Sequence, residues 1–259
     1  MKIYLDSAQP AAWTLPAGCP DVCGVTTNPS LVYQAGLPVT LASYVSLLDA
    51  AGAHGLGEMM LQLPSPDAAL ALQWLSPLQA RAAAAGVKLT IKLPCHPDWL
   101  PCIRAVQQAG QDFLLTGLSN PVQLLWARSL KAAYVAPYVG RLVADGRDVW
   151  PLLQACVAMQ TGGPALLAAS IKSPEVLSRL MACGAAAVTL PPASLIAWRL
   201  VTGFFLGGCL PSCLAMVTAA APVARRGLAI MVLFTGYGLG AALAGLVATG
   251  FAAHGGWRA

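Results

Sequence analysis

Short apolar runs alternate with longer Ala- and Leu-rich stretches along residues 1–192. Each apolar run ends in a polar residue, and each longer stretch has helical character. Strands that alternate with helices favour a parallel sheet with helical crossovers. The predicted strands are Lys2–Asp6, Val22–Thr27, Glu58–Leu63, Val87–Leu93, Asp112–Gly117, Tyr134–Val139, Ala165–Ser170 and Ala186–Leu190. Eight such units closing on themselves predict an α/β fold of the TIM (β/α)8 type.

Four turns carry a small polar side chain directly before a proline. They are Asn28-Pro29, Ser65-Pro66, Asn120-Pro121 and Ser173-Pro174. Such a side chain caps free N–H groups of a helix, and proline suits the first helical position. We therefore predict that a helix begins at each turn and that the turns mark the carboxyl ends of the preceding strands.

Alternation along each strand indicates which side chains face the barrel interior. On the seventh strand, this reasoning places Ala168 and Ser170 together on the inner face. The inward polar residues at strand ends are Asp6, Thr26, Asn28, Gln62, Lys92, Thr116, Tyr138 and Ser170. Because barrels keep their active sites at this end, we expect them to converge on one mouth. Taken singly, each could instead be a satisfied polar group of the core.

Lys92 is the residue around which this set is organised. The apolar side chains of strand 87–93 share one face, whereas Thr90 and Lys92 share the other. If that face meets water, Lys92 is an ordinary solvated lysine. If it is enclosed, lost hydration lowers the pKa of the amine, which can then attack a carbonyl and form a Schiff base. The protonated imine permits making or breaking the adjacent carbon–carbon bond when a neighbouring group moves protons.

The other inward residues suit supporting roles in such chemistry. Asp6 could hold substrate hydroxyls or exchange a proton, and Gln62, Thr116 and Tyr138 could position a catalytic water.

An anion-binding end is expected beside them. Arg141, Ser170 and the helix start at Ser173-Pro174 form a candidate phosphate seat, to which Lys172 can add. The alternative for Arg141 is a surface salt bridge.

Charge is distributed unevenly along the chain. The last acidic residue is Glu175, and beyond it the only charged residues are Arg179, Arg199, Arg225, Arg226 and Arg258. Removing these five from 15 basic residues leaves 10, against 10 acids, so the earlier part is neutral. Nucleic-acid binding, which requires a clustered basic face, is not expected. The eight cysteines read as reduced thiols without the paired spacing of a zinc site, so no metal is expected.

Five segments together resemble the transaldolase family. They are Ile3–Ala8, Gly24–Leu31 with its Gly-Val-Thr-Thr-Asn-Pro-Ser run, the Lys92 strand ending in Lys-Leu-Pro, Tyr134–Arg141 and Leu167–Ser170. The resemblance covers residues 1 to about 195. It implies a class I aldolase or transaldolase that acts on a sugar phosphate such as fructose 6-phosphate, without a cofactor and as a homo-oligomer. Lys92 is then the Schiff-base lysine.

Two residues resemble one branch of the family more than the other. Gln62 stands where transaldolases carry glutamate, and Tyr138 stands where many carry phenylalanine, which resembles the fructose-6-phosphate aldolase branch. The segment Pro94–Trp99 departs from the usual turn after the lysine strand, and Ser119 replaces an aromatic residue. His96 in that segment could sit at the mouth, although a lone loop histidine is more often solvated.

The sequence changes character after Leu195. Residues 200–217 and 228–253 carry no charge, and each run is long enough for a membrane-spanning helix with Arg225-Arg226 on the cytoplasmic side. Two buried helices of a soluble domain are the alternative. The tail resembles a fragment of a major facilitator transporter, nearest the aromatic-acid/proton symporters. Two helices of about twelve cannot enclose a transport path.

The sequence therefore predicts two parts that join near Ser194–Trp198. Residues 1–195 form the barrel, and residues 196–259 form a two-helix hydrophobic tail in place of the barrel's last helix. We expect a cytoplasmic barrel that the segment 200–253 can tether to the inner membrane. Three functions compete: an active aldolase or transaldolase, a membrane or transport-related protein, and an inactive fusion product.

Overall fold

The computed structural model describes residues 1–16, 19–222 and 225–253. The chain divides into two compact units, Met1–Ala197 and Trp198–Ala259, and each is described by itself.

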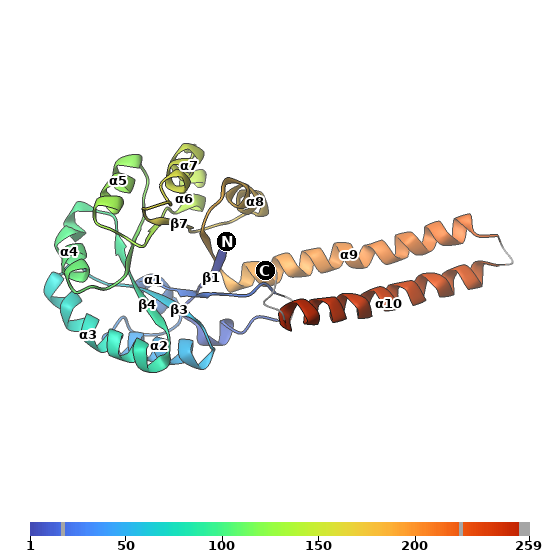
Figure 1. Cartoon of the computed structure of the whole chain (residues 1–259), viewed down its shortest axis with the longest axis horizontal. Coiled ribbons are helices and arrows are strands. Elements are labelled where there is room, and N and C mark those ends of the chain that lie inside the picture. Colours follow the sequence, from blue (N-terminus) through green and yellow to red (C-terminus); the bar gives the residue numbers. More distant parts are fainter. Residues whose placement is uncertain (17–18, 223–224, 254–259) are drawn as a thin grey trace. The chain divides into compact units, whose positions relative to one another are not determined.

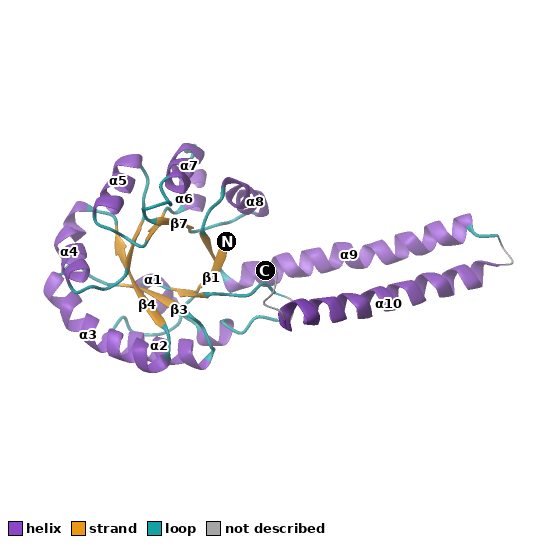
Figure 2. Ribbon diagram, viewed as in Figure 1, coloured by secondary structure: helices purple, strands orange, loops and turns teal. Residues whose placement is uncertain are grey.

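Eight parallel strands of the first unit close into a barrel, and they follow one another around it in chain order (Figures 1 and 2). The strands are β1 (Lys2–Asp6), β2 (Gly24–Thr26), β3 (Glu58–Gln62), β4 (Lys88–Pro94), β5 (Phe113–Thr116), β6 (Tyr134–Ala136), β7 (Ala165–Ala168) and β8 (Ala187–Leu190). Parallel pairing of β1 with β8 completes the ring. The predicted α/β barrel is confirmed.

Helices follow the strands and cover the outside of the strand ring (Figure 2). They are α1 (Pro29–Gln34), α2 (Leu41–Ala53), α3 (Ala68–Ala85), α4 (Leu100–Gln108), α5 (Pro121–Ser129), α6 (Val139–Ala144), α7 (Trp150–Ala158) and α8 (Pro174–Cys183). Two short 3-10 helices, η1 (Pro10–Ala12) and η2 (Pro97–Trp99), lie in loops after β1 and β4. Helix α9 (Pro192–Ala220) begins directly after β8, and α10 (Arg226–Ala253) follows it.

Three of the four predicted helix starts are confirmed. The side chains of Asn28, Asn120 and Ser173 accept hydrogen bonds from backbone N–H groups in the first turns of α1, α5 and α8. The prediction for Ser65 is wrong, because α3 starts at Ala68 and Asp67 caps it. The Asp67 carboxylate accepts from two backbone N–H groups, whereas the Ser65 hydroxyl only accepts from the N–H of Asp67.

The barrel interior is filled by one cluster of buried side chains. It consists of Tyr4, Met60, Leu114, Tyr134, Ala136, Leu167 and Ala187. Leu167, rather than Ala168, is the interior residue of β7, so the predicted inner face of this strand is wrong. Ser170 has a φ of 60°, in the left-handed region that non-glycine residues seldom adopt. This backbone conformation breaks the alternation that the prediction assumed.

The second unit contains the greater part of α9 and all of α10. Both runs predicted to span a membrane include side chains outside the described residues, at 202, 204–210, 237–238, 241–242 and 244–253. Within the part of the chain that is described, no helix has the length and apolar character needed to cross a membrane. The two predicted spans are therefore not confirmed.

Close backbone packing at the start of α6 holds the end of β7 in place. A Cβ atom at Gly140 would lie 1.9 Å from the carbonyl oxygen of Ser170 and 3.1 Å from Cγ of Lys172. The first distance is far below van der Waals contact and involves backbone, so the loop at Ser170 would have to move. Glycine at this position therefore lets α6 approach the segment that carries Ser170 and Lys172.

We predict that Gly140→Ala destabilises the barrel, because the added methyl group displaces the backbone at Ser170. Overpacking of this kind costs about 1–3 kcal/mol in the free energy of unfolding, measurable by urea denaturation. Gly203→Ala is the matched control, because its Cβ would meet no atom of the described residues within 4 Å. Equal stability of the two variants would contradict the packing argument.

Candidate active site

A cavity of about 190 Å³ opens at the carboxyl ends of the strands. Its lining comes from strands β1, β4 and β8 and from the segments that follow β2, β6, β7 and β8. Seven of the ten predicted site residues line it: Asp6, Asn28, Lys92, Tyr138, Arg141, Ser170 and Lys172. Ala169, Ile171, Thr189 and Pro191 complete the lining. Residues far apart in sequence thus meet at the mouth where polar strand ends were expected to converge.

Lys92 is enclosed by the barrel, with only 6% of its surface exposed. It lies on β4 opposite Gln62 of β3 and Leu114 of β5 in the strand register. Burial lowers the pKa of its amine below the ordinary lysine value of about 10.4, and the negative charge of Asp6 opposes that shift. The solvated-lysine alternative does not apply to this side chain. A larger fraction of neutral, nucleophilic amine is available than on an exposed lysine.

Asp6 faces the cavity at the end of β1 and is held there by a neighbour. The hydroxyl of Thr26 on β2 donates a hydrogen bond of 2.9 Å to the Asp6 carboxylate. Thr26 is fully buried and does not line the cavity. Its place in the structure is therefore to orient Asp6.

Gln62 and Thr116 lie beside the cavity lining without belonging to it. The backbone carbonyl of Gln62 accepts a 2.7 Å hydrogen bond from the Tyr44 hydroxyl, while its buried side-chain oxygen has no partner among the described residues. The Thr116 hydroxyl donates to the carbonyl of Ala136 at 3.4 Å. Thr116 thus has the contact expected of a satisfied core group, whereas Gln62 keeps a free acceptor next to Lys92.

Cationic side chains gather at the side of the cavity formed by the segments after β6 and β7. The Arg141 guanidinium lies over the Tyr138 ring, 4.7 Å from its centroid, and Lys172 follows the strained residue Ser170. Neither Arg141 nor Lys172 forms an ion pair with a carboxylate of the described chain, so the salt-bridge alternative for Arg141 does not apply there. Two cations beside a serine hydroxyl can bind an anionic group.

Two helix-capping side chains flank the same region. The Asn28 side chain accepts from the N–H of Leu31 at 3.0 Å, and the Ser173 hydroxyl accepts from Val176 at 3.3 Å. Asn28 lines the cavity while it caps α1. Ser173 does not line the cavity. The predicted contribution of the α8 start to the phosphate seat therefore stays a prediction.

Sequence reasoning missed Thr189 on β8. Its side chain lines the cavity, is 97% buried and has a hydroxyl without a partner among the described residues. The strand itself was predicted, and alternation from the interior residue Ala187 would have pointed to Thr189. The signal was overlooked because threonine in a strand is ordinarily read as a β-forming residue.

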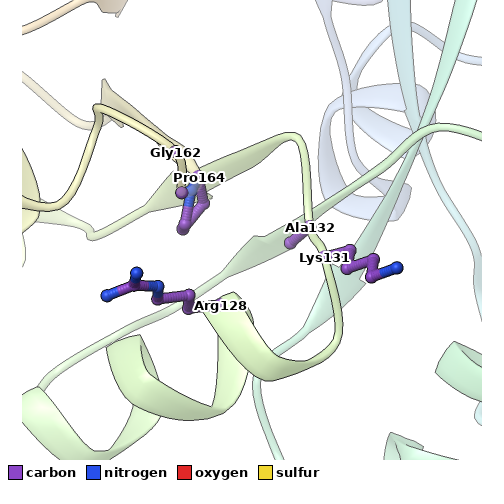
Figure 3. Close-up of a pocket in the computed structure, with 6 residues that line it drawn as sticks. Arg128, Lys131, Ala132, Gly162 and Pro164 are labelled. Atoms are coloured by element: carbon purple, nitrogen blue, oxygen red, sulfur yellow. The ribbon is translucent and has the colours of Figure 1, made fainter.

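Two further features do not join this site. His96 is exposed at 62% of its side-chain surface, lies 3.3 Å from Asp98 and does not line the cavity. A second hollow of about 260 Å³ lies near the amino ends of β6 and β7, lined by Arg128, Lys131, Ala132, Gly162, Gly163 and Pro164 (Figure 3). The Arg128 and Lys131 side chains point away from each other in Figure 3, and the lining holds no acid or nucleophile besides Lys131.

Metal ligands do not cluster in the part of the chain that the structure describes. There, no three His, Cys, Asp or Glu side chains come together as a metal ion would require. Burial raises the pKa of the Cys95 thiol, close to the end of β4, to about 12. That thiol therefore stays protonated and is a poor ligand or nucleophile at neutral pH.

One family model matches the C-terminal part of the chain, and one solved structure is similar to most of it. The model of the Major Facilitator Superfamily matches residues 172–259, which is about a third of the chain. Among solved structures, one titled "Native KDPGal structure" is 17% identical, with a TM-score of 0.46, and the match covers 73% of this chain and 80% of that one. The fold assignment rests on the strand order of the barrel itself.

One family model and two curated proteins match the barrel part of the chain. The family model described as Transaldolase/Fructose-6-phosphate aldolase matches residues 78–202. A "Probable transaldolase" of Nitrosopumilus maritimus is 28% identical over 197 residues, covering 74% of this chain and 84% of that protein. A "Probable transaldolase" of Rhodospirillum centenum is 30% identical over 197 residues, covering 74% of this chain and 81% of that protein. The chain therefore belongs to the transaldolase/fructose-6-phosphate aldolase family.

Proposed function

We propose that this chain is a class I aldolase or transaldolase in which Lys92 forms a Schiff base with a sugar phosphate. The observation that carries the proposal is the burial of Lys92 in the wall of a cavity that Asp6 also lines. A lysine amine of lowered pKa is the nucleophile that carbonyl attack requires. Membership of the family supports the same reading.

The reaction follows from the groups around the amine. Neutral Lys92 attacks the substrate ketone to give a carbinolamine, which loses water to become a protonated imine. The imine accepts the electron pair of the carbon–carbon bond between its α and β carbons as that bond breaks, and a base removes the proton from the hydroxyl on the β carbon, which leaves as an aldehyde. We assign this proton to Asp6, whose carboxylate lines the same cavity.

The second half of the reaction decides between cleavage and transfer. Protonation of the resulting enamine, followed by hydrolysis, releases dihydroxyacetone and restores the amine. Attack of the enamine on an acceptor aldehyde transfers the three-carbon unit instead. The free side-chain oxygen of Gln62 and the Tyr138 hydroxyl are the groups that we assign to the water needed for hydrolysis.

Substrate orientation follows from the charge distribution in the cavity. Arg141 and Lys172 lie on the lining segments after β6 and β7, whereas Lys92 lies on β4. A phosphate held by these cations and by Ser170 directs the carbonyl end of the sugar toward Lys92. The proposal therefore includes a sugar phosphate as substrate and requires no cofactor.

The match to a transporter family supports a second candidate function for residues 198–259. Large apolar side chains of this unit are exposed, including Leu200, Met216, Leu228, Met231 and Val232. Such a surface suits contact with lipid or with another protein. We propose that this unit affects the location and solubility of the protein and contributes no group to the chemistry, since every lining residue lies at or before Pro191.

We predict that Lys92 carries the covalent intermediate. Borohydride reduction in the presence of dihydroxyacetone or fructose 6-phosphate should add the substrate mass to the peptide that contains Lys92. Lys92→Ala should abolish labelling and lower turnover by more than about a thousandfold, because Lys172, the other amine of the lining, is assigned to the phosphate and not to carbonyl attack. Lys2→Ala is the control and should label normally. Labelling that persists in Lys92→Ala would refute the assignment.

We predict that addition with free dihydroxyacetone is at least as fast as transfer between two sugar phosphates. Gln62 is neutral, so it can orient water for hydrolysis but cannot take up a proton as glutamate does. Gln62→Glu should therefore shift the ratio of transfer to addition upward, roughly fivefold or more. Product analysis by chromatography measures both rates in one mixture. Strong transfer without any use of free dihydroxyacetone would overturn the branch assignment.

We predict that residues 198–259 are dispensable for Schiff-base formation. Replacing them with a polar-faced amphipathic helix after Ala197 should retain labelling at Lys92, because the cavity is complete without them. The replacement should also increase the fraction of protein that stays in solution without detergent, since it removes the exposed apolar side chains. An inactive replacement, combined with a full-length chain that needs no detergent, would show that the segment belongs to the working enzyme.

A further inference from the structure

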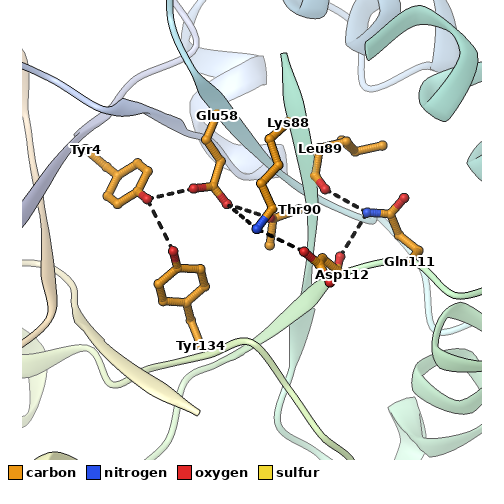
Figure 4. Close-up of polar contacts among 8 residues, drawn as sticks. All are labelled: Tyr4, Glu58, Lys88, Leu89, Thr90, Gln111, Asp112 and Tyr134. Carbon is orange, nitrogen blue, oxygen red and sulfur yellow. Dashed lines mark hydrogen bonds and ion pairs between the residues drawn. The ribbon is translucent and has the colours of Figure 1, made fainter. Parts of the chain in front are cut away.

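A buried carboxylate lies inside the barrel, away from the cavity at its mouth. Glu58 opens strand β3, and only 6% of its surface is exposed. Its carboxylate accepts a 2.7 Å hydrogen bond from the Tyr4 hydroxyl and a 2.6 Å hydrogen bond from the Thr90 hydroxyl (Figure 4). Burying a carboxylate is costly unless strong hydrogen bonds compensate it, so this arrangement requires a reason beyond packing.

The two hydroxyl donors come from strands that are not neighbours in the barrel. Tyr4 lies on β1, which pairs with β2 and β8, whereas Thr90 lies on β4, which pairs with β3 and β5. No backbone ladder joins β1 to β4. The Glu58 carboxylate therefore connects them through the interior, with charge-assisted bonds that are stronger than neutral ones.

Each donor also lies on the same strand as one of the proposed reacting groups, two residues before it. Tyr4 precedes Asp6 by two residues, and Thr90 precedes Lys92 by two, so each pair shares an inner strand face. The hydrogen bonds through Glu58 thus fix the separation of β1 and β4 at Tyr4 and Thr90, which are the inward-facing positions just before Asp6 and Lys92. Geometry errors of about an ångström at a reacting centre are enough to slow catalysis severely.

We infer that Glu58 is a positioning residue: by joining Tyr4 to Thr90, it sets the separation between the Asp6 carboxylate and the Lys92 amine. This inference rests on the proposed Schiff-base function and adds to it the device that holds the acid–amine pair together. Glu58 itself is not among the residues that line the cavity.

Charged and titratable groups around Glu58 preserve the connection. Burial, followed by the hydrogen bonds with Tyr134 and Glu58, raises the pKa of Tyr4 well above its ordinary value, so its hydroxyl remains a donor. Burial alone lowers the pKa of Lys88, but its hydrogen bond to Asp112 and the charge of Glu58 outweigh that effect and raise it. Lys88 lies 3.9 Å from the Glu58 carboxylate and 2.9 Å from that of Asp112. Figure 4 shows these groups converging at the amino ends of β3, β4 and β5.

The test uses the full-length protein and two nearly isosteric variants. Thr90→Val and Tyr4→Phe each remove one donor to Glu58 and leave the volume of the side chain almost unchanged. The measurement is the rate of reductive trapping of dihydroxyacetone at Lys92 as a function of pH, alongside a thermal melt. Tyr134→Phe is the matched control, because it removes a hydroxyl that lies 3.4 Å from Tyr4 but leaves both bonds to Glu58 intact.

Both variants should move the midpoint of the trapping profile to lower pH by roughly half a unit, because a more distant Asp6 stabilises the Lys92 ammonium less. Turnover should fall about fivefold with little change in KM. Besides Asp6, the titratable groups that line the cavity with Lys92 are Tyr138, Arg141 and Lys172, and none of them is altered. In an Asp6→Asn background, the additional shift caused by Thr90→Val should vanish. Tyr134→Phe should keep the wild-type profile.

Different failures have different meanings. If Lys92 is not labelled in the wild-type protein, the proposed function is wrong and the inference falls with it. If labelling occurs but Thr90→Val and Tyr4→Phe keep the wild-type pH profile, even with a lower melting temperature, Glu58 is a structural group only. A shift of equal size with and without the Asp6 carboxylate would also overturn the inference, because the separation of Asp6 and Lys92 could not then be its cause.

Discussion

Burial of the Lys92 ammonium beside a single carboxylate is the interaction on which this site depends. A buried cation is unfavourable in the apolar wall of a barrel, and its easiest response is to lose its proton. Asp6 counters that response and keeps the pKa from falling as far as burial alone would take it. The amine therefore gives up its proton more readily than an exposed lysine does, while a carboxylate still lines the same cavity. Both properties suit the proposed role, in which the amine attacks as a neutral base and then carries the positive charge of an imine.

The closed parallel barrel creates this environment around Lys92. Eight strands in register bring the polar ends of β1 and β4 to the same mouth, while Tyr4, Met60, Leu114 and Leu167 fill the interior. A second polar centre at Glu58 lies near the amino ends of β3 and β4. The barrel therefore has polar groups at two levels, with apolar side chains packed within the same interior. Hydrogen bonds at the Glu58 level can fix strand positions without occupying the cavity that Lys92 lines.

Patterns of local sequence predicted most of the fold, since strands, capping turns and alternation depend on neighbouring residues. They predicted Lys92 and Asp6 at the mouth for the same reason. The predicted inner face of β7 is wrong at Ala168, because the left-handed backbone at Ser170 breaks the alternation, and the helix start predicted at Ser65 is wrong because Asp67 is the cap. Thr26 and Thr116 were placed in the site, but their hydrogen bonds to Asp6 and to Ala136 are visible only in three dimensions. The carboxylate of Glu58 is likewise indistinguishable in sequence from a solvated strand residue.

The cavity also limits where the enzyme part of the chain can end. The transporter family model begins its match at residue 172, and the transaldolase model ends its match at 202, so sequence comparison assigns 172–202 to both. Lys172, Thr189 and Pro191 nevertheless line the same cavity as Asp6 and Lys92. Strand β8 is hydrogen-bonded to β1 and closes the barrel, and Leu195 is buried in the first turns of α9. A barrel that lacked this segment would expose its interior and lose part of the site, so residues up to about Ala197 belong physically to the barrel whatever the origin of the sequence that follows.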